Sequence, residues 1–244
     1  MHIKQSLFIF LCLLPMALTS CNDSPVSSSA QAATSFSKSL PGPVVVELFQ
    51  SQGCSSCPPA NIALNAEVDR SDVIALNFAV TYWDRLGWKD IFGDPAYTQR
   101  QYDYAAALKD TQVYTPQVVV NGRRAIVGNG PGEIHNAIAT STALSGGPVI
   151  TYGKQSVTVG AGSGAATVWL VRYDPHIQNV EIKAGENKGR TIPHRNIVRQ
   201  LVKLGSWNAK AANYALPKSP SAAYKSAILV QRTGGGAIYS AKII

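Results

Sequence analysis

Two cysteines separated by two serines, Cys54-Ser55-Ser56-Cys57, are the residues of this chain whose types and spacing most directly predict chemistry. Two thiols at this spacing can form a disulfide and exchange it with the thiols of another molecule. A disulfide that closes so short a loop restricts the unfolded chain very little, so it would add little to stability. The pattern therefore predicts thiol–disulfide exchange, with Cys54 and Cys57 as the reacting pair.

The other two cysteines lie in an N-terminal segment that has the features of an export signal. A basic residue precedes the apolar run 7–14, which is too short to cross a membrane as a permanent helix. The sequence Leu18-Thr19-Ser20-Cys21 resembles the cleavage motif of bacterial lipoproteins, so we expect residues 1–20 to be removed and Cys21 to be lipidated. A cut after Ala32, or an ordinary secretory signal, would also export the chain.

Export leaves one pair of free thiols in the mature protein. Cys12 would be lost with the signal and Cys21 would carry lipid, which leaves Cys54 and Cys57. We expect the mature chain in the periplasm or at the outer membrane, where a disulfide can persist. Its partners would be protein or small-molecule thiols and disulfides and, through the lipid anchor, a membrane. The formal net charge of +8 would suit anionic lipid but is better explained by solubility, and the compartment argues against nucleic acid.

The residues around the cysteines predict alternating strands and helices over residues 43–146, after a tether at 21–42 rich in Ser, Ala and Pro. Continuous apolar runs predict buried strands, Asp94-Pro95 predicts the start of a helix, and Asn121-Gly122 predicts a hairpin turn. The order is β-α-β, α, β-β-α, which is the topology of thioredoxin. The predicted elements are strands at 44–49, 73–80, 117–120 and 125–127, and helices at 58–70, 95–108 and 132–143.

The pattern changes after Gly146-Gly147-Pro148, where short apolar runs are separated by Gly, Pro, Asn and Asp. This pattern is typical of an antiparallel sandwich. We therefore predict an α/β thioredoxin-like domain followed by a smaller all-β, sandwich-like domain over 147–244. Its predicted strands are 156–159, 167–173, 180–183, 192–202, 227–232 and 237–243.

The first strand and helix of this order place the cysteines where a thiolate is favoured. Cys54 would lie at the start of the helix, where unpaired backbone N–H groups and the helix dipole stabilise negative charge. Cys57 would lie one turn inside the helix and be more buried, so Cys54 is predicted to be the nucleophile and Cys57 the resolving thiol. Pro58 and Pro59 suit a first helical turn, because N–H groups there have no acceptor within the helix.

Three further residues are candidate site residues. Thr115-Pro116 precedes the hairpin strand, where thioredoxin-like proteins carry a cis-proline beside the disulfide and offer backbone hydrogen bonds to a bound peptide. A trans proline that only begins an edge strand is the alternative. Glu47 lies between apolar residues of the first strand, where a buried carboxylate is costly and could accept the proton of Cys57. A wet position at the strand edge is an equally good explanation.

Four segments carry a resemblance to known families: residues 49–59 (FQSQGCSSCPP), 82–90 (YWDRLGWKD), 113–122 (VYTPQVVVNG) and 186–191 (ENKGRT). At the cysteines the chain resembles the thioredoxin superfamily. More closely, it resembles a secreted bacterial family, the domain of unknown function 1223 family, over nearly the whole mature chain. The resemblance implies a thioredoxin domain followed by a β-rich domain, with no established substrate.

The chain departs from these families at four positions. Gly53 stands where thioredoxins place Trp, so the usual aromatic platform is absent. Ala79 and Thr81 stand where the closer family often has His and Asp, and Asn61 stands where Asp is common. These departures weaken any role that depends on those groups, including metal binding. We therefore predict no metal and no cofactor.

Two other functions compete with a thiol–disulfide oxidoreductase. The first is a cell-envelope binding module with a non-catalytic disulfide, in which the aromatic residues at 82–92 and the second domain would bind a peptide or glycan; such aromatics are more often core. The second is Cu(I) binding by two thiolates and a histidine. No histidine has ligand spacing to the cysteines, so copper is the weaker alternative; the candidates are His135, His176 and His194.

Overall fold

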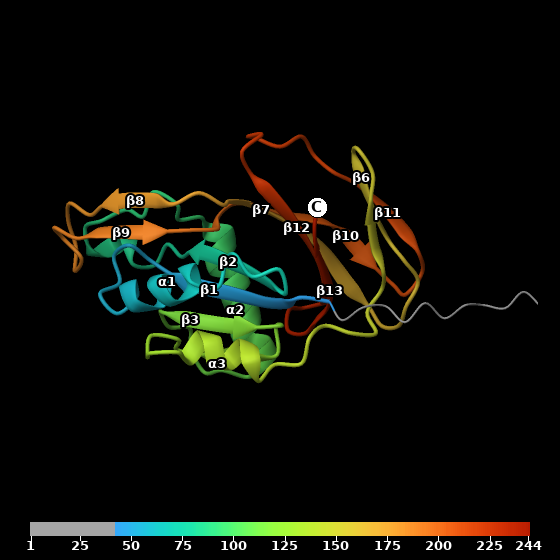
Figure 1. Ribbon diagram of the computed structural model, residues 1–244, viewed down its shortest axis with the longest axis horizontal. Helices are drawn as coiled ribbons and strands as arrows, with labels where there is room; N and C mark the ends of the chain where they lie inside the picture. The colour runs from blue at the N-terminus through green and yellow to red at the C-terminus, as the bar shows by residue number, and fades with distance from the viewer. Residues whose placement is uncertain (1–41) are drawn as a thin grey trace, which may run out of the picture. The chain divides into compact units, whose positions relative to one another are not determined.

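The structure is a computed structural model that describes residues 42–244 (Figure 1). The predicted signal peptide, the lipidation site Cys21 and the tether up to residue 41 lie outside the described residues. The fold is mixed α/β, with one large mixed sheet and additional antiparallel strands. Among the described helices, none has the length and apolar character that crossing a membrane requires.

An eight-stranded sheet runs through the molecule in the order β13-β12-β7-β10-β2-β1-β3-β4. β2 pairs parallel with both β1 and β10, and the other pairs are antiparallel. β1 and β2 are fully buried, as their continuous apolar runs predict. The strands are β1 (Val44–Gln50), β2 (Val73–Ala79), β3 (Gln117–Val120), β4 (Arg124–Ile126), β7 (Ala166–Asp174), β10 (Ile197–Trp207), β12 (Lys225–Arg232) and β13 (Ile238–Ile243).

Helices cover both faces of the β1–β2–β3 part of this sheet. α1 (Pro58–Asn65) and α3 (Glu133–Ala139) pack on the face that includes Val46 and Leu48, and α2 (Pro95–Leu108) packs on the opposite face. The alternation of side chains along β1 produces this division, because successive residues of a strand point to opposite faces. A short 3₁₀ helix, η1 (Asp84–Leu86), lies between β2 and α2.

Two helices end earlier than their sequences predict. α1 ends at Asn65 rather than near residue 70, and turn hydrogen bonds continue the chain, among them Arg70 N to Glu67 O at 3.3 Å. α3 ends at Ala139 because the hydroxyls of Thr140 and Ser141 donate back to carbonyls of the last turn, at 2.7 and 2.6 Å. Side chains that bond nearby backbone compete with further helix in this way.

The C-terminal part does not form a sandwich separate from the first domain. Four of its strands extend the sheet of β1 and β2, so the sheet crosses the boundary predicted at residue 147. β10 joins β2 at Ile197 and Asn77, and the side chain of Asn196 donates to the carbonyl of Ala75 at 2.8 Å. This pairing covers an edge of β2 that would otherwise be open. The pairing joins residues far apart in the chain, and local sequence patterns do not predict such a pairing.

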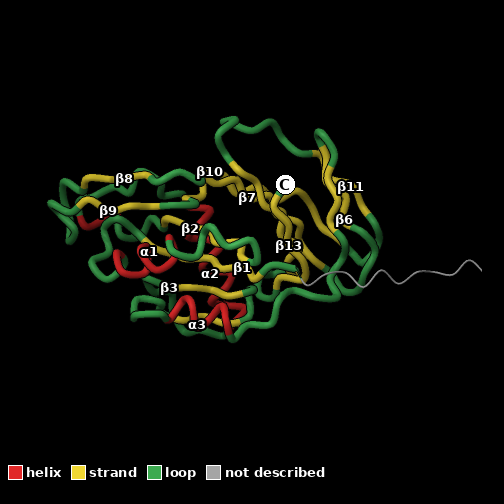
Figure 2. Tube along the Cα trace, viewed as in Figure 1, coloured by secondary structure: helices red, strands yellow, loops and turns green. Residues whose placement is uncertain are grey.

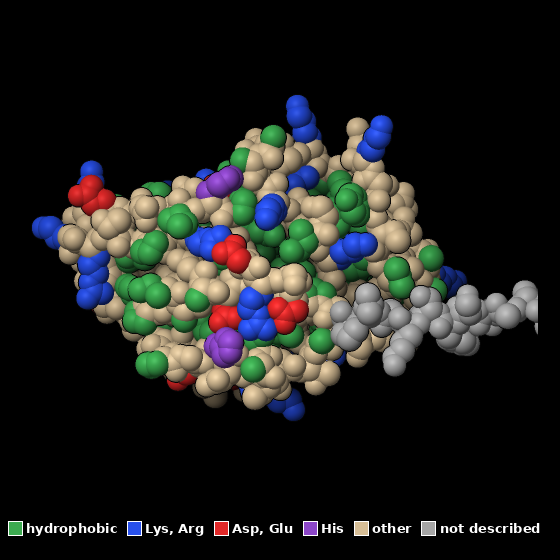
Figure 3. Space-filling model, in the orientation of Figure 1, with side chains coloured by type: hydrophobic (Ala, Val, Ile, Leu, Met, Phe, Trp, Pro, Cys, Tyr) green, Lys and Arg blue, Asp and Glu red, His purple; other side chains and the backbone are tan. Residues whose placement is uncertain are grey.

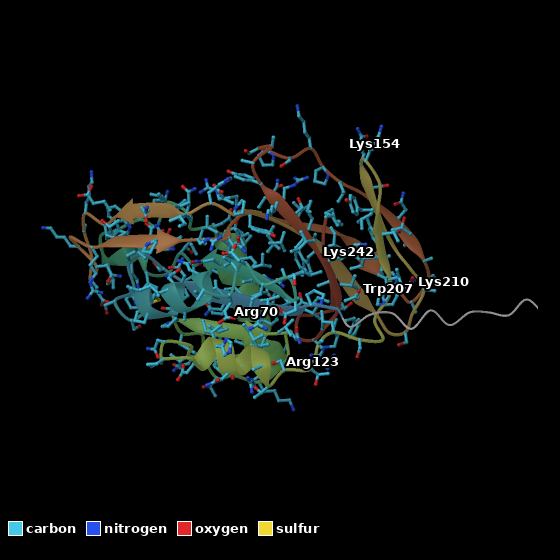
Figure 4. All side chains as sticks on the ribbon, in the orientation of Figure 1. Arg70, Arg123, Lys154, Trp207, Lys210 and Lys242 are labelled. Atoms are coloured by element: carbon cyan, nitrogen blue, oxygen red, sulfur yellow. A yellow bond between two sulfur atoms is a disulfide. The ribbon has the colours of Figure 1, made fainter. Side chains whose placement is uncertain are left out.

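A sandwich-like layer does form at the far end of this sheet (Figures 1 and 2). A three-stranded sheet in the order β11-β6-β5 packs on it through an apolar cluster that includes Val168, Leu170 and Trp207. Trp207 is almost fully buried and donates from Nε1 to the carbonyl of Gly160 at 3.1 Å (Figure 4). Two of these strands lie outside the predicted set, β5 (Ile150–Tyr152) and β11 (Ala212–Ala215); the third is β6 (Ser156–Val159).

The single strand predicted at 192–202 is two strands in the structure. β9 (Thr191–His194) pairs with β8 (Gln178–Glu181) in a separate hairpin, and β10 begins at Ile197. Asn196 separates them with a φ of 48°, a left-handed conformation that interrupts a strand. The β8–β9 hairpin lies beside α1, where Asn65 donates from Nδ2 to the carbonyl of Pro193 at 3.0 Å (Figure 1).

Candidate functional site

Cys54 and Cys57 lie between the end of β1 and the start of α1, as predicted, but Cys57 is the N-cap rather than a residue one turn inside the helix. They form a disulfide with a Cα–Cα distance of 5.4 Å. Cys57 is the N-cap of α1, and the next two residues are the prolines of its first turn. We call residues 51–57 the redox loop. The strand fixes one end of this loop and the helix fixes the other, so both sulfurs have a defined position.

The segment before β3 reaches the redox loop from 59 positions along the chain. The Thr115–Pro116 peptide is cis, and the hydroxyl of Ser56 lies 3.4 Å from the carbonyl oxygen of Thr115. Trp83 donates from its indole nitrogen to the hydroxyl of Thr115 at 2.7 Å. Thr115 and Pro116 therefore lie beside the redox loop, and an aromatic residue from the segment before α2 joins them.

The hydroxyl of Ser56 also lies 3.4 Å from the Sγ atom of Cys54. Because a disulfide sulfur carries no proton, Ser56 is the donor in this contact. The hydroxyl has one proton and two acceptors within reach, the sulfur of Cys54 and the carbonyl of Thr115. A hydrogen-bond donor at the sulfur favours the thiolate of Cys54 over its thiol.

Glu47 is fully buried, but on the sheet face that packs against α2. Its carboxylate accepts hydrogen bonds from Arg100 Nε at 2.7 Å, from Arg100 Nη2 at 3.1 Å and from the hydroxyl of Tyr104. α1, which begins after Cys57, packs on the other face. The partners of Glu47 are therefore Arg100 and Tyr104 rather than Cys57, which leaves the predicted proton transfer without a supporting contact. The alternative of a wet strand edge is also wrong.

Both sulfurs are covered in the structure. Cys54 and Cys57 are each 0% exposed, whereas the two serines between them are exposed. The sequence predicts a less buried Cys54 and a more buried Cys57, and this difference is not observed. The connection between β8 and β9, far along the chain, contacts the backbone of Gln52, Cys54 and Ser55 beside the sulfurs.

Residues 184–190, which we call the cover loop, make this contact. The side-chain amide of Asn187 donates to the carbonyl oxygens of Gln52 at 2.9 Å and Cys54 at 2.8 Å. The carboxylate of Glu186 accepts from the backbone N–H of Ser55 at 3.1 Å, and the side chain and backbone N–H of Ser55 together lower the pKa of Glu186. Sequence reasoning gave these two residues no role, although they lie in one of the segments that carried the family resemblance.

Asp90 holds the redox loop from the other side, and it too was missed. It is almost fully buried, and its carboxylate accepts from the backbone N–H of Gln52 at 2.8 Å and of Phe92 at 2.9 Å. The side chain of Gln52 in turn accepts from the indole nitrogen of Trp88 at 2.9 Å. Desolvation raises the pKa of Asp90 to about 6, against the effect of the two N–H donors.

The raised pKa of Asp90 predicts a pH dependence of stability with a definite sign. Since the pKa of Asp90 is about 6 in the folded chain against an ordinary value of 3.8, the folded state takes up a proton at a higher pH than the unfolded state does. Between pH 7 and pH 5 the wild type should therefore gain about 1 kcal/mol in free energy of unfolding relative to Asp90→Asn. Urea denaturation at the two pH values measures this difference. A difference of the opposite sign would contradict the assignment.

A polar cluster lies on the α1 face of the sheet, within one helical turn of Cys57. Asn61 donates to Gln50 Oε1 at 3.1 Å, accepts from Asn77 at 2.7 Å, and lies 3.2 Å from His194 Nδ1. All four side chains are buried, and burial lowers the pKa of His194 to about 4, so its ring is neutral at neutral pH. The backbone N–H of Asn61 donates to the carbonyl of Cys57 at 3.1 Å, which links this cluster to the redox loop.

The histidines have separate partners. His135 lies 3.1 Å from Glu67, His176 lies 2.8 Å from Asp174, and His194 lies in the polar cluster. Within residues 42–244, no group of three or more His, Cys, Asp or Glu side chains has the geometry of a metal site. On the face in Figure 3, Lys and Arg side chains are scattered and several lie beside Asp or Glu; Arg70, which bonds both Glu67 and Asp72, is one such case (Figure 4).

A family model described as "Protein of unknown function (DUF1223)" matches residues 45–231. This chain belongs to the DUF1223 family. The DUF1223 chain is similar to the crystal structure of a protein from Agrobacterium tumefaciens, with 32% identity, a TM-score of 0.70, and coverage of 84% of this chain and 95% of that one. HBP35 of Porphyromonas gingivalis has a TM-score of 0.56 at 13% identity, covering 84% of this chain and 76% of that one, which is a likeness of fold alone. No curated protein matches significantly.

The DUF1223 match confirms the family predicted from the sequence. The matched range contains the redox loop, Asp90, Thr115, Pro116 and the cover loop. The residues matched by the family model therefore include both the redox loop and the cover loop that contacts it.

Proposed function

We propose that this DUF1223 chain is an exported thiol–disulfide oxidoreductase with a thioredoxin-like core, held at a membrane by lipid on Cys21. The observation that carries the proposal is the disulfide at the junction of β1 and α1, beside the segment of Thr115 and Pro116. The topology of β1–α1–β2, α2 and β3–β4–α3 supports the thioredoxin-like assignment. The substrates are protein or small-molecule thiols and disulfides.

The reaction proceeds by two exchanges at sulfur. From the oxidised form, a substrate thiolate attacks Cys54, a mixed disulfide forms, and the Cys57 thiolate leaves. The second substrate thiolate then attacks the substrate sulfur of the mixed disulfide and expels Cys54. The substrate becomes oxidised by two electrons and the protein becomes a dithiol. The reverse sequence reduces a substrate disulfide, and Cys57 then acts as the resolving thiol.

Cys54 is the attacking residue in the reduced form. Its sulfur has the hydroxyl of Ser56 within 3.4 Å and lies before the N-terminus of α1, whose dipole favours negative charge. Cys57 is part of the helix start and has no such hydroxyl contact among the hydrogen bonds of the described chain. These contacts favour a lower pKa for the Cys54 thiol than for a free thiol, whose pKa is about 8.5.

The test is the pH dependence of alkylation in the reduced protein. Cys54 should alkylate faster than Cys57, with a pKa below about 8.5. Ser56→Ala should raise the pKa of Cys54, because it removes a hydrogen bond to the charged form. Ser55→Ala is the matched control, since the contacts of Ser55 are to Glu186. Equal and slow reactivity of both cysteines would count against the proposal.

One observation favours a second function, a binding module in which the disulfide only holds a loop. Both sulfurs are fully covered, which is unusual for a pair that must meet a substrate. The two functions differ in a direct way: a holding disulfide stays oxidised in the folded protein whatever thiols are present. Thiol trapping of the exported protein, followed by mass measurement of the modified peptides, separates them.

A further inference from the structure

The cover loop meets the redox loop through one buried side chain. Asn187 is 0% exposed, and both protons of its amide nitrogen are donated to the redox loop, to the carbonyls of Gln52 and Cys54. Its amide oxygen accepts from Arg190 Nη1 at 3.0 Å. A reversed amide would direct its oxygen at two carbonyl oxygens, so the three contacts fix the orientation of the group. Asn187 therefore belongs to the site geometrically, although it is 133 positions from Cys54.

Backbone hydrogen bonds within the cover loop and to Ile182, the last buried residue before it, brace the loop. Ile182 N donates to Arg190 O at 2.9 Å, Gly189 N donates to Ile182 O at 2.8 Å, and Lys188 N donates to Gly185 O at 3.2 Å. Gly185 has a φ of 73°, and a Cβ atom there would lie 3.3 Å from Cβ of Trp88, so glycine allows the close approach to the aromatic segment.

The base and the tip of the hairpin are held by different forces. The base is apolar: Val180, Ile182 and Ile192 are buried together with Phe92. The tip has exposed residues at 188–190, and its contacts with the redox loop are the hydrogen bonds of Asn187 and Glu186. Hydrogen bonds exchange readily with water, whereas apolar burial does not, so the tip can open while the base stays packed.

The tip also brings a negative charge to the nucleophile. The carboxylate of Glu186 bonds the backbone N–H of Ser55, the residue that follows Cys54. A carboxylate at this point disfavours a thiolate on Cys54 by like-charge repulsion. The closed loop therefore suits the oxidised form. Its carboxylate opposes the charge that reduction creates, and both sulfurs are 0% exposed while the loop contacts the backbone beside them.

We propose that Asn187 is the positioning residue that closes the cover loop over the disulfide, and that opening of this loop admits the substrate thiol to Cys54. The inference rests on the proposed function. It adds that the cover loop acts as a gate that controls access to the sulfur of Cys54. In the closed form the substrate thiolate cannot reach the sulfur of Cys54. When Asn187 releases the two carbonyls, the first exchange of the reaction can begin, with Cys57 as the leaving thiolate.

The test is the rate at which dithiothreitol reduces the disulfide of the folded protein, followed by the appearance of free thiols. Asn187→Ala should accelerate reduction roughly 10- to 30-fold, because two hydrogen bonds that hold the closed form are lost. Asn187→Asp, which keeps the shape but cannot donate to either carbonyl, should do the same. Asn179→Ala is the matched control, an exposed asparagine of β8 without a side-chain hydrogen bond in the described chain, and it should leave the rate unchanged.

Low concentrations of urea distinguish gating from general destabilisation. If the loop alone opens, the reduction rates of the wild type and both Asn187 variants stay nearly independent of urea below the unfolding transition. If the variants merely unfold more often, their rates rise steeply with urea, and this result would overturn the proposal. Unchanged rates in both Asn187 variants would overturn it as well.

The same variants distinguish failure of the proposed gate from failure of the proposed oxidoreductase function. Faster reduction of the Asn187 variants, with no catalysed exchange between a substrate disulfide and a dithiol, would support the gate and overturn the oxidoreductase. Catalysed exchange by the wild type, together with disulfide reduction rates in Asn187→Ala and Asn187→Asp that equal the wild-type rate, would support the oxidoreductase and overturn the gate.

Discussion

Replacement of Arg100 by Met is expected to lower the free energy of unfolding by about 3–5 kcal/mol, because it leaves the carboxylate of Glu47 buried without its cation. Glu47 is 0% exposed and Arg100 is 4% exposed, so water cannot replace the lost charge without opening the core. This change has the largest expected effect on stability of those we consider. Urea denaturation at neutral pH measures it.

The arrangement around Arg100 explains the size of the effect. Nε and Nη2 both donate to Glu47, Nη2 also donates to the hydroxyl of Tyr104 at 3.0 Å, and Nη1 donates to Gln231 at 3.0 Å. The guanidinium also lies 5.6 Å from the ring centroid of Trp169. Arg100 thus joins β1 and α2 to the strands β7 and β12 of the C-terminal part. Its loss should weaken the packing between the two parts of the chain.

A second substitution separates loss of charge from loss of packing. The double variant Arg100→Met with Glu47→Gln removes both charges and should recover more than half of the lost free energy, since no unpaired ion remains. Arg123→Met is the control, because Arg123 is exposed and its side chain makes no hydrogen bond in the described chain; it should change stability by less than about 0.5 kcal/mol. A loss below about 1 kcal/mol for Arg100→Met would show that the pair is not energetically important.

Cys57→Ser is expected to give the largest effect on activity. Without Cys57 as resolving thiol, release of the mixed disulfide between Cys54 and a substrate depends on a thiol from outside the protein, so the mixed disulfide should accumulate as a covalent complex. Catalysed exchange between a substrate disulfide and a dithiol should fall to the uncatalysed rate. Non-reducing gels of the exported protein, followed by mass spectrometry of the captured partner, measure both the complex and its composition.

Cys54→Ser is the matched control for this experiment. It leaves a single thiol, Cys57, at the start of α1, and it should give neither a complex nor exchange activity. Combining Cys57→Ser with Asn187→Ala should increase the yield of the complex if the cover loop limits access. Equal trapping by the two single variants would contradict the assignment of Cys54 as the nucleophile.

The sequence alone identified the pair of cysteines that forms the disulfide and its local setting. Apolar runs, the Asp94-Pro95 helix start and the Asn121-Gly122 turn each act through residues close in the chain, so the strands and helices around Cys54 and Cys57 could be predicted. Asp94 does accept from the N–H of Ala96 at 2.8 Å, and Asn121 and Gly122 do form the turn between β3 and β4. The family was also evident from short segments near these residues.

The roles of Glu47 and of the cover loop depended on the tertiary structure. The sequence shows that Glu47 is flanked by apolar residues, but not which face of the sheet it occupies or that Arg100 is there to pair with it. In the same way, nothing near Asn187 in sequence indicates that it reaches the carbonyl of Cys54. Contacts between distant segments depend on how sheets and helices pack, and local periodicity and capping contain little information on that packing.

The same reason explains the sheet that joins the two parts of the chain. Each strand of the C-terminal part could be expected from its own residues, yet the pairing of Ile197 with Asn77 is a choice among many possible edges. That choice sets β10 beside β2, and the β8–β9 hairpin that precedes β10 contacts the redox loop through Asn187. The disulfide and its local setting were therefore determined by residues close in sequence, whereas the burial of that disulfide was decided by strand pairing and packing across the whole fold.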